Sequence, residues 1–286
     1  MVSTLNDGTV VLDEVGDEID EILWLPHDPT DGATTMAEEN VERLAQGEVP
    51  TVTPGFVEEV VETLVNPSTP HNGQPMPECV QHANARNPTP PFEGEARWWI
   101  RSTTIPTEQG LDRLDVTRDL IAAWDNWQFS DNVCGFADDI RFRHRYSGWL
   151  DHPTGTDPDA ICGAPDGYNM VDFGVLRDST GLGNLVLAKN CTRRNDNNGQ
   201  VETDVKFNRW DVDWFVGSVP TGCDPYSDGS PHSVENIMTH EVGHTLGLGH
   251  VVDGAANLTM YPYARNCSRD QTTLGWGDIK LARELY

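Results

Sequence analysis

The sequence has few basic residues, and lysine is especially scarce. Its 286 residues include 19 Lys and Arg against 46 Asp and Glu, which gives a formal net charge of −27. Only Lys189, Lys206 and Lys280 are lysines. So acidic a surface repels phosphate, which argues against nucleic acid as a partner. There is also no run of eighteen apolar residues, so we expect no membrane-spanning segment.

Cysteine pairs of the C-x-x-C type are absent as well, which disfavours a cysteine zinc site or a thioredoxin-like redox centre. An even number of widely scattered cysteines instead predicts two or three disulfides and an exported, extracellular protein. The six cysteines are residues 79, 134, 162, 191, 223 and 267. The first residues are acidic where a signal peptide has a basic start and an apolar stretch, so no signal peptide is visible in this chain.

Residues 1–92 differ in composition from the rest of the chain. They are an acidic, proline-rich extension with two helical patterns, around 36–45 and 56–64. The stretch 66–93 holds seven prolines and reads as a linker. We expect a loosely ordered prodomain here. An inhibitory extension, an interaction segment and a solvated tail without a role are the alternatives.

Residues 93–286 have the pattern of one compact α+β domain, with strands in the middle and helices towards the end. A helix is predicted from Leu114 to Trp127, where apolar residues recur at close to helical spacing. Between Ile140 and Arg145 apolar and basic residues alternate, as in a half-buried strand. Further short strands are predicted at 97–102, 171–175, 185–188 and 205–207.

One segment carries most of the chemical information: HEVGHTLGLGH, residues 240–250. Ser230 followed by Pro231 predicts the start of its helix, as a capping residue and then proline at the first helical position. His240 and His244 are one turn apart on that helix, so both imidazoles project from the same side and can share one metal ion. Zinc accepts neutral imidazole nitrogen in tetrahedral geometry.

The neighbouring residues of the segment complete the expected zinc site. Glu241 follows the first histidine, where it can touch a metal-bound water without being a ligand. Gly247 permits the helix to stop and the chain to turn, which brings His250 in as a third ligand. Three protein ligands leave the fourth position open for water, which is typical of a catalytic zinc. A lone H-x-x-x-H pair is often accidental, but here five fixed positions agree.

The segment resembles the metzincin signature H-E-x-x-H-x-x-G-x-x-H, which is followed by a methionine turn. Met260-Tyr261-Pro262-Tyr263 is similar to the matrixin form of that turn, although the second tyrosine comes one residue early. Residues 274–286, with an Asp-Ile pair and a final Leu-Tyr, resemble the closing matrixin helix. The resemblance covers about residues 95–286 and leaves 1–92 uncovered.

The resemblance implies a zincin/metzincin fold, with a twisted mixed sheet, an active-site helix and an irregular C-terminal subdomain that ends in a helix. It implies that His240, His244 and His250 are zinc ligands and that Glu241 is the general base. The protein would then be a zinc-dependent endopeptidase that hydrolyses peptide bonds by attack of a zinc-bound water. Its partners would be proteins or peptides, and we expect a monomer.

The resemblance also implies roles around the metal. Met260 would form a packing floor beneath the ion, while Pro262 and Tyr263 would form a wall of the specificity pocket. An edge strand near Gly183–Leu187 would bind substrate as an added antiparallel strand, through its unpaired backbone groups.

Two features depart from the family pattern. Matrixins often stay latent through a prodomain cysteine, but Cys162 lies inside the catalytic region and Cys79 lacks the motif. Cys162 is better interpreted as a disulfide cysteine, and a switch role for Cys79 stays open. The structural zinc run is missing too, since His144, Asp151 and His152 do not match it. Structural calcium is an alternative in the loops 151–166 and 178–199, although any solvated loop contains such oxygens.

Two rival functions share these motifs. A catalytically silent binding or adhesion module could keep the fold, but the presence of Glu241 favours an enzyme because a silent module needs no base beside the metal. A narrow peptidase that processes a single partner shares every motif and differs only in its substrates.

Overall fold

The computed structural model describes residues 2–4, 10–12, 21–24, 76–87, 92, 94–177, 185–194, 201–227, 229–251 and 255–286. The helical patterns expected at 36–45 and 56–64 lie outside these residues. No helix in the described part of the chain is long and apolar enough to cross a membrane.

The domain is built on a mixed sheet whose strand order is β13-β3-β8-β9-β7-β5-β6. Five neighbouring strands, which end at the edge strand β6, follow the expected α+β pattern: β6, β5, β7 and β9 run parallel to one another, and β8 runs antiparallel to β9. These five are β5 (Glu95–Ile100), β6 (Arg143–Trp149), β7 (Met170–Gly174), β8 (Leu185–Arg194) and β9 (Val201–Asn208).

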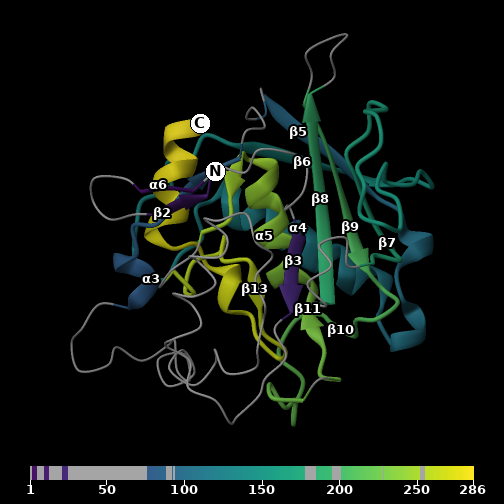
Figure 1. Cartoon of the computed structure of the whole chain (residues 1–286). Helices are drawn as coiled ribbons and strands as arrows, with labels where there is room; N and C mark the ends of the chain where they lie inside the picture. Colours follow the sequence, from purple (N-terminus) through teal and green to yellow (C-terminus); the bar gives the residue numbers. More distant parts are fainter. Residues whose placement is uncertain are drawn as a thin grey trace.

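Two short strands extend the sheet beyond β8. β3 (Glu21–Trp24), from the N-terminal extension, pairs antiparallel with β8, and β13 (Tyr263–Ala264) pairs parallel with β3. In Figure 1, β3 lies directly beside β8. β1 (Val2–Thr4) and β2 (Val10–Leu12) form a separate antiparallel pair.

Most predicted strands are found, with shifted ends. The strand expected at Ile140–Arg145 begins only at Arg143, yet Ile140 and Phe142 are buried and Arg141 is exposed, as the alternation predicts. β8 and β9 are longer than expected, because the pairing between them runs from Ala188 to Arg194 and holds polar residues that carry little strand signal.

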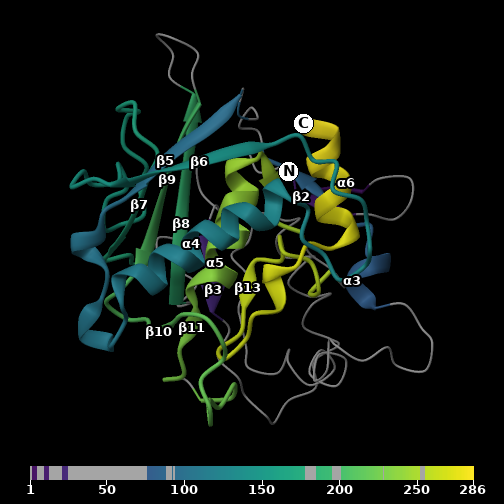
Figure 2. The same cartoon turned by 180° about the vertical axis from the view of Figure 1, so that it is seen from behind.

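Two long helices cover one face of the sheet, as Figures 1 and 2 show from opposite sides. α4 (Arg113–Gln128) is the predicted amphipathic helix, and Asp112 caps it by accepting hydrogen bonds from two backbone N–H groups. α4 packs against α5 (Val234–Thr245), and α5 in turn lies on β8. Trp98 of β5 stacks on Trp124 of α4 with ring centroids 5.2 Å apart, which fixes helix to sheet.

The predicted helix start at Ser230 and Pro231 is wrong. α5 begins at Val234, and the hydroxyl of Ser233 accepts a hydrogen bond from the N–H of Asn236. The reason is a tertiary pairing: β11 (His232–Ser233) lies parallel to β10 (Trp214–Phe215), so these residues are extended rather than helical.

The C-terminal part lies on the other side of α5 from the sheet, and Figure 2 shows α6 and α3 there. It comprises β12 (Leu248–Gly249) and α6 (Trp276–Leu285). The proline-rich stretch contributes to it as well. α3 (Pro77–Val80) packs beside α6, and β4 (Ala85–Arg86) pairs antiparallel with β12.

All six cysteines form disulfides, which confirms the larger of the two predicted numbers, three. The bonds are Cys79–Cys134, Cys162–Cys191 and Cys223–Cys267. Cys162 is therefore the disulfide cysteine that its position indicated. A switch role for Cys79 is excluded in this structure, because its thiol is bonded to Cys134.

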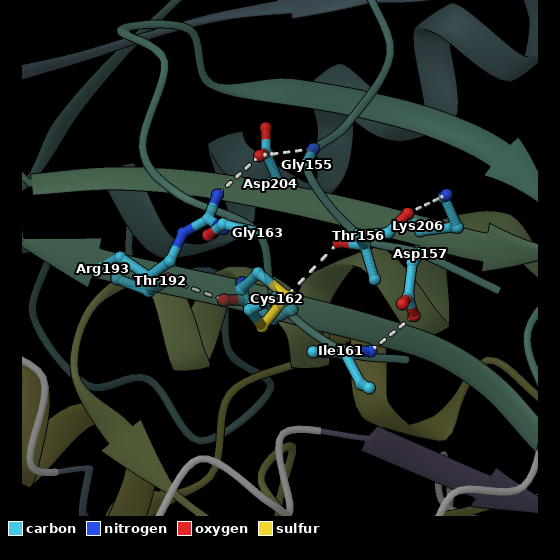
Figure 3. The surroundings of a disulfide bond; sticks show 12 residues. Gly155, Thr156, Asp157, Ile161, Cys162, Gly163, Thr192, Arg193, Asp204 and Lys206 are labelled. Carbon is cyan, nitrogen blue, oxygen red and sulfur yellow. Dashed lines mark hydrogen bonds and ion pairs between the residues drawn. A yellow bond between two sulfur atoms is a disulfide. The ribbon is translucent and has the colours of Figure 1, made fainter. Parts of the chain in front are cut away.

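The loop 151–166 covers the face of the sheet opposite the helices. Cys162 of this loop is bonded to Cys191 of β8 (Figure 3). Beside it, Arg193 of β8 contacts Asp204 of β9 at 2.8 Å and donates to the carbonyl of Gly163. The N–H of Gly155 donates to the same Asp204 carboxylate at 2.9 Å. A covalent bond and a buried charged group thus hold the loop on the strands.

Candidate active site

The last two turns of α5 bring two of the predicted ligands together, and the following turn supplies the third. The Nε2 atoms of His240 and His244 each lie 3.1 Å from Nε2 of His250. Two nitrogens bound to one zinc at 2.0–2.1 Å in tetrahedral geometry are roughly 3.3 Å apart. The three histidines are buried and form the single group with metal-binding geometry found among the described residues.

Backbone carbonyls orient two of the rings. Nδ1 of His240 lies 2.7 Å from the carbonyl oxygen of Thr259, and Nδ1 of His244 lies 2.9 Å from that of Leu248. A carbonyl oxygen only accepts, so each Nδ1 carries the proton and each Nε2 is free of one. The donor set therefore fits a divalent ion of zinc type.

Burial keeps the ligands in the neutral form that a metal requires. Desolvation is the main cause that lowers the pKa of His244 to about 4, and the positive charge of Lys189 acts in the same direction. Desolvation also lowers the pKa of His250 well below its usual value, with the two neighbouring histidines adding to the effect.

The turn after α5 ends the helix as the sequence predicts. Gly247 has φ of +93°, a conformation that suits glycine, and its N–H donates to the carbonyl of His244. β12 follows, and β4 pairs with it, while the N–H of Asn87 donates to the carbonyl of Gly247 at 2.9 Å. The segment 76–87 thus supports the loop that carries His250.

Met260, the residue after Thr259, lies against the helix that carries the two predicted ligands His240 and His244. Its side chain is buried, and its sulfur packs against Gly243 of α5 and beside Trp127 of α4. The carboxylate of Asp278 in α6 accepts hydrogen bonds from the backbone N–H groups of Thr259 and Met260, at 2.9 and 3.3 Å. The final helix thereby holds the methionine turn.

The structure places the remaining predicted residues as follows. Glu241 is on α5 between the two histidines and is fully buried. Pro262 is buried next to β13, and Tyr263, in β13, packs with Leu176 and with Val186 of β8. Burial raises the pKa of Tyr263. Of the predicted edge strand, residues 185–187 belong to β8, and 183 and 184 lie outside the described residues.

The candidates for a second metal site are not brought together. Nε2 of His144 lies 2.9 Å from Asp125, and its Nδ1 accepts a hydrogen bond from Trp98. Asp151 is paired with Arg101, and His152 is paired with Asp166. Each therefore has its own protein partner. Structural calcium in the loop 151–166 stays a prediction.

Two buried polar residues beside the site were not assigned any role from the sequence. In the sequence Asn190 is only the start of an Asn-Cys-Thr triplet, and Asp278 is part of the Asp-Ile pair in the closing helix. Both act on the backbone of residues next to the metal ligands. Asn190 lies two residues beyond the strand predicted at 185–188, so no signal in the sequence points to it.

α5 thus carries two facing histidines, a glycine turn and a third histidine follow it, and Met260 packs against it, which is the arrangement that the metzincin signature predicts. The sequence model of the matrixin family matches residues 175–286, so this part of the chain, which includes the three histidines, is similar to the matrixin class of metzincins. That class is a family of zinc metalloproteases. No curated protein is similar enough to the chain to count as a match.

Proposed function

We propose that this protein is a zinc-dependent endopeptidase in which His240, His244 and His250 hold the ion and Glu241 is the general base. The observation that carries this proposal is that the Nε2 atoms of the three histidines converge: those of His240 and His244 each lie 3.1 Å from that of His250. Glu241 is on α5, the helix that also carries His240 and His244. The matrixin match supports the same class of enzyme.

When bound at these residues, zinc would lower the pKa of a water molecule to about 7 and would polarise the scissile carbonyl. The carboxylate of Glu241 accepts the proton of the attacking water and later delivers it to the leaving amine, a contribution of about 10²–10⁴-fold. Thr259 and Leu248 keep the proton on Nδ1 of His240 and His244, so the lone pairs of Nε2 stay directed at the ion.

The test is cleavage of a diverse peptide library by the full chain with zinc, next to its Glu241→Gln variant. We expect wild-type cleavage of internal peptide bonds and a loss of at least about 100-fold in the variant, with zinc content unchanged. Glu284→Gln on α6 is the control, because Glu284 is an exposed partner of Arg86. Equal cleavage by wild type and Glu241→Gln would contradict the role of the base.

The rival functions predict different results in the same experiment. A catalytically silent binding or adhesion module binds zinc and cleaves no peptide. A narrow processing peptidase leaves the library intact but cuts one partner at one site. Mass spectrometry of the peptide library, and of a mixture of secreted proteins incubated with the enzyme, separates these outcomes. A silent module leaves both intact, and a narrow peptidase cuts one protein of the mixture.

The N-terminal extension supplies an inhibitory strand in this proposal. β3 adds to β8 in the antiparallel direction expected of a substrate, it is flanked by β13 with the proposed pocket residue Tyr263, and it also lies beside α5. In the same structure Glu241 and the first two histidines have 0 % exposure. In this proposal β3 occupies the edge of β8 where a substrate would bind, and this is why Glu241, His240 and His244 are not exposed to solvent.

A proline in β3 tests this inhibition in the full chain. Ile22→Pro removes a backbone donor and distorts the strand, so it weakens pairing with β8. We expect faster cleavage of a short peptide than by wild type. Val11→Pro is the control, because β2 pairs with β1 alone among the described strands. Equal rates for wild type and both variants would contradict an inhibitory role of β3.

We further propose that the catalytic unit begins near residue 76 and works outside the cytosol. Its first segment is bonded to the domain through Cys79–Cys134 and through pairing of β4 with β12. Three disulfides suit an oxidising, extracellular setting. Cleavage upstream of residue 76 would leave this segment attached.

A further inference from the structure

A buried polar network joins the sheet to the helix that carries the proposed base. The side-chain amide of Asn190 in β8 donates to the backbone carbonyl of Glu241 at 2.8 Å and to the hydroxyl of Thr245 at 2.9 Å. The hydroxyl of Thr203 in β9 lies 2.9 Å from that of Thr245. Asn190 and Thr245 have no solvent exposure, and Thr203 has 2 %.

The orientation of the Asn190 amide follows from its partners. The carbonyl of Glu241 only accepts, so the amide nitrogen must face α5. The amide oxygen on the opposite side accepts a hydrogen bond from Thr192 at 2.6 Å. Because these groups are shielded from water, exchanging the donor for an acceptor leaves a buried carbonyl facing another acceptor, which is costly.

This contact ties two parts of the site that lie far apart in sequence. β8 is the strand along which β3 runs in the direction expected of a substrate. The helical turn that Asn190 contacts carries His240, Glu241 and His244. A bond from β8 to the backbone of Glu241 therefore sets the position of that residue relative to anything bound along β8.

We infer that Asn190 is a positioning residue, which fixes Glu241 relative to a peptide bound along β8. The inference rests on the proposed function, since it assumes that Glu241 acts on such a peptide. It requires Asn190 to affect the catalytic step more than zinc binding. Both ring-orienting carbonyls, those of Thr259 and Leu248, belong to other segments. The side-chain hydrogen bonds of Asn190 in the described part of the chain go to Glu241, Thr245, Thr203 and Thr192.

Asn208 offers a matched control in the same sheet. It is also fully buried, and its amide donates to two backbone carbonyls, those of Leu176 and Val186, at 3.1 and 2.9 Å. Neither of these residues belongs to α5. Asn208→Asp removes equivalent hydrogen bonds from the fold without touching the helix, so it separates a loss of stability from a loss of positioning.

The experiment compares wild type, Asn190→Asp and Asn208→Asp as full chains on one peptide that the wild type cleaves. For Asn190→Asp we expect kcat to fall about 10–100-fold, because small displacements of a catalytic group have effects of this size. KM should stay within about threefold, and metal analysis should give the wild-type zinc content. Asn208→Asp should keep the wild-type kcat even where its Tm falls.

Thr245 provides a second pair of variants should Asn190→Asp fold poorly. Thr245→Val removes the hydroxyl that accepts from Asn190, and Thr245→Ser keeps it. We expect a reduced kcat for Thr245→Val and recovery for Thr245→Ser.

Three outcomes would overturn the inference: an unchanged kcat in Asn190→Asp, an equal fall of kcat in Asn208→Asp, or a loss of zinc that accounts for the fall in activity. Failure of the proposed function looks different, because the wild type itself then cleaves no peptide.

Discussion

The sulfur of Met260 occupies the space that a side chain on Gly243 would need. A Cβ at position 243 would lie 2.1 Å from that sulfur and 3.0 Å from the ring of Trp127. The helix that carries His240 and His244 therefore rests directly on the methionine turn. Glycine at this position permits the close approach.

This contact predicts that Gly243→Ala is destabilising. The added methyl group displaces Met260 within a packed core, which lowers the free energy of unfolding by about 1–3 kcal/mol. Because the turn also contains Thr259, whose carbonyl orients His240, zinc affinity should fall as well. Urea unfolding and competition with a chromophoric chelator measure the two effects. Gly229→Ala, where the new Cβ meets no atom within 4 Å, should match wild type.

Asp278 gives a prediction about the final helix. Its carboxylate accepts from the backbone N–H groups of Thr259, Met260 and Gly275. In Asp278→Asn one acceptor becomes a donor that faces another donor, so we expect a loss of about 1–3 kcal/mol in urea unfolding. Asp139→Asn is the control, since Asp139 is an exposed partner of Arg283. Equal losses in both variants would contradict a special role for Asp278.

His232 gives a prediction about pH. Burial lowers its pKa in the folded protein to about 3, from 6.5. Below pH 6.5 the unfolded chain therefore binds a proton that the folded protein does not, so this residue makes stability fall with falling pH. Through this residue the free energy of unfolding falls by at most about 1.4 kcal/mol per pH unit between about pH 6.5 and pH 3.

The variant His232→Phe removes this titration and should lose less stability on acidification than wild type. Urea midpoints at pH 7, 5.5 and 4.5 measure the difference, which should be constant above pH 7 and grow below 6.5. Parallel curves for the two proteins would contradict it. Other buried histidines contribute equally to both proteins and cancel in the comparison.

The disulfide Cys162–Cys191 supports the loop 151–166 and ends on the residue next to Asn190. Changing both cysteines to serine opens a closed loop with a sequence separation of 29. Loop entropy predicts a loss of roughly 3–4 kcal/mol in urea unfolding. A loss below about 1 kcal/mol would show that the contacts of Arg193 and Asp204 hold the loop without the disulfide.

Local sequence signals predicted the elements that carry the chemistry. His240 and His244 are four residues apart on one helix, and Gly247 ends it, so their arrangement follows from helix geometry alone. The strands predicted at 171–175 and 205–207 are also recognisable from a local signal, a short run of residues that is largely apolar. Such features depend on neighbours in sequence.

Long-range contacts explain what the sequence could not provide. Pairing of β11 with β10 made His232 and Ser233 extended, against the cap signal at Ser230. The spacing of cysteines does not determine their connectivity, so the partner of Cys79 was unknown. Asn190 acts through residues of two other elements that only the folded chain brings together.

The central claim is that a single zinc ion held by three histidines supports peptide hydrolysis. Its most direct test is titration of the metal-free full chain with zinc while cleavage of one internal peptide bond is measured. We predict that activity rises linearly and stops rising at one equivalent of zinc, and that His250→Ala shows no such rise. Full activity without zinc, or one equivalent bound with no cleavage of any peptide, would contradict the account.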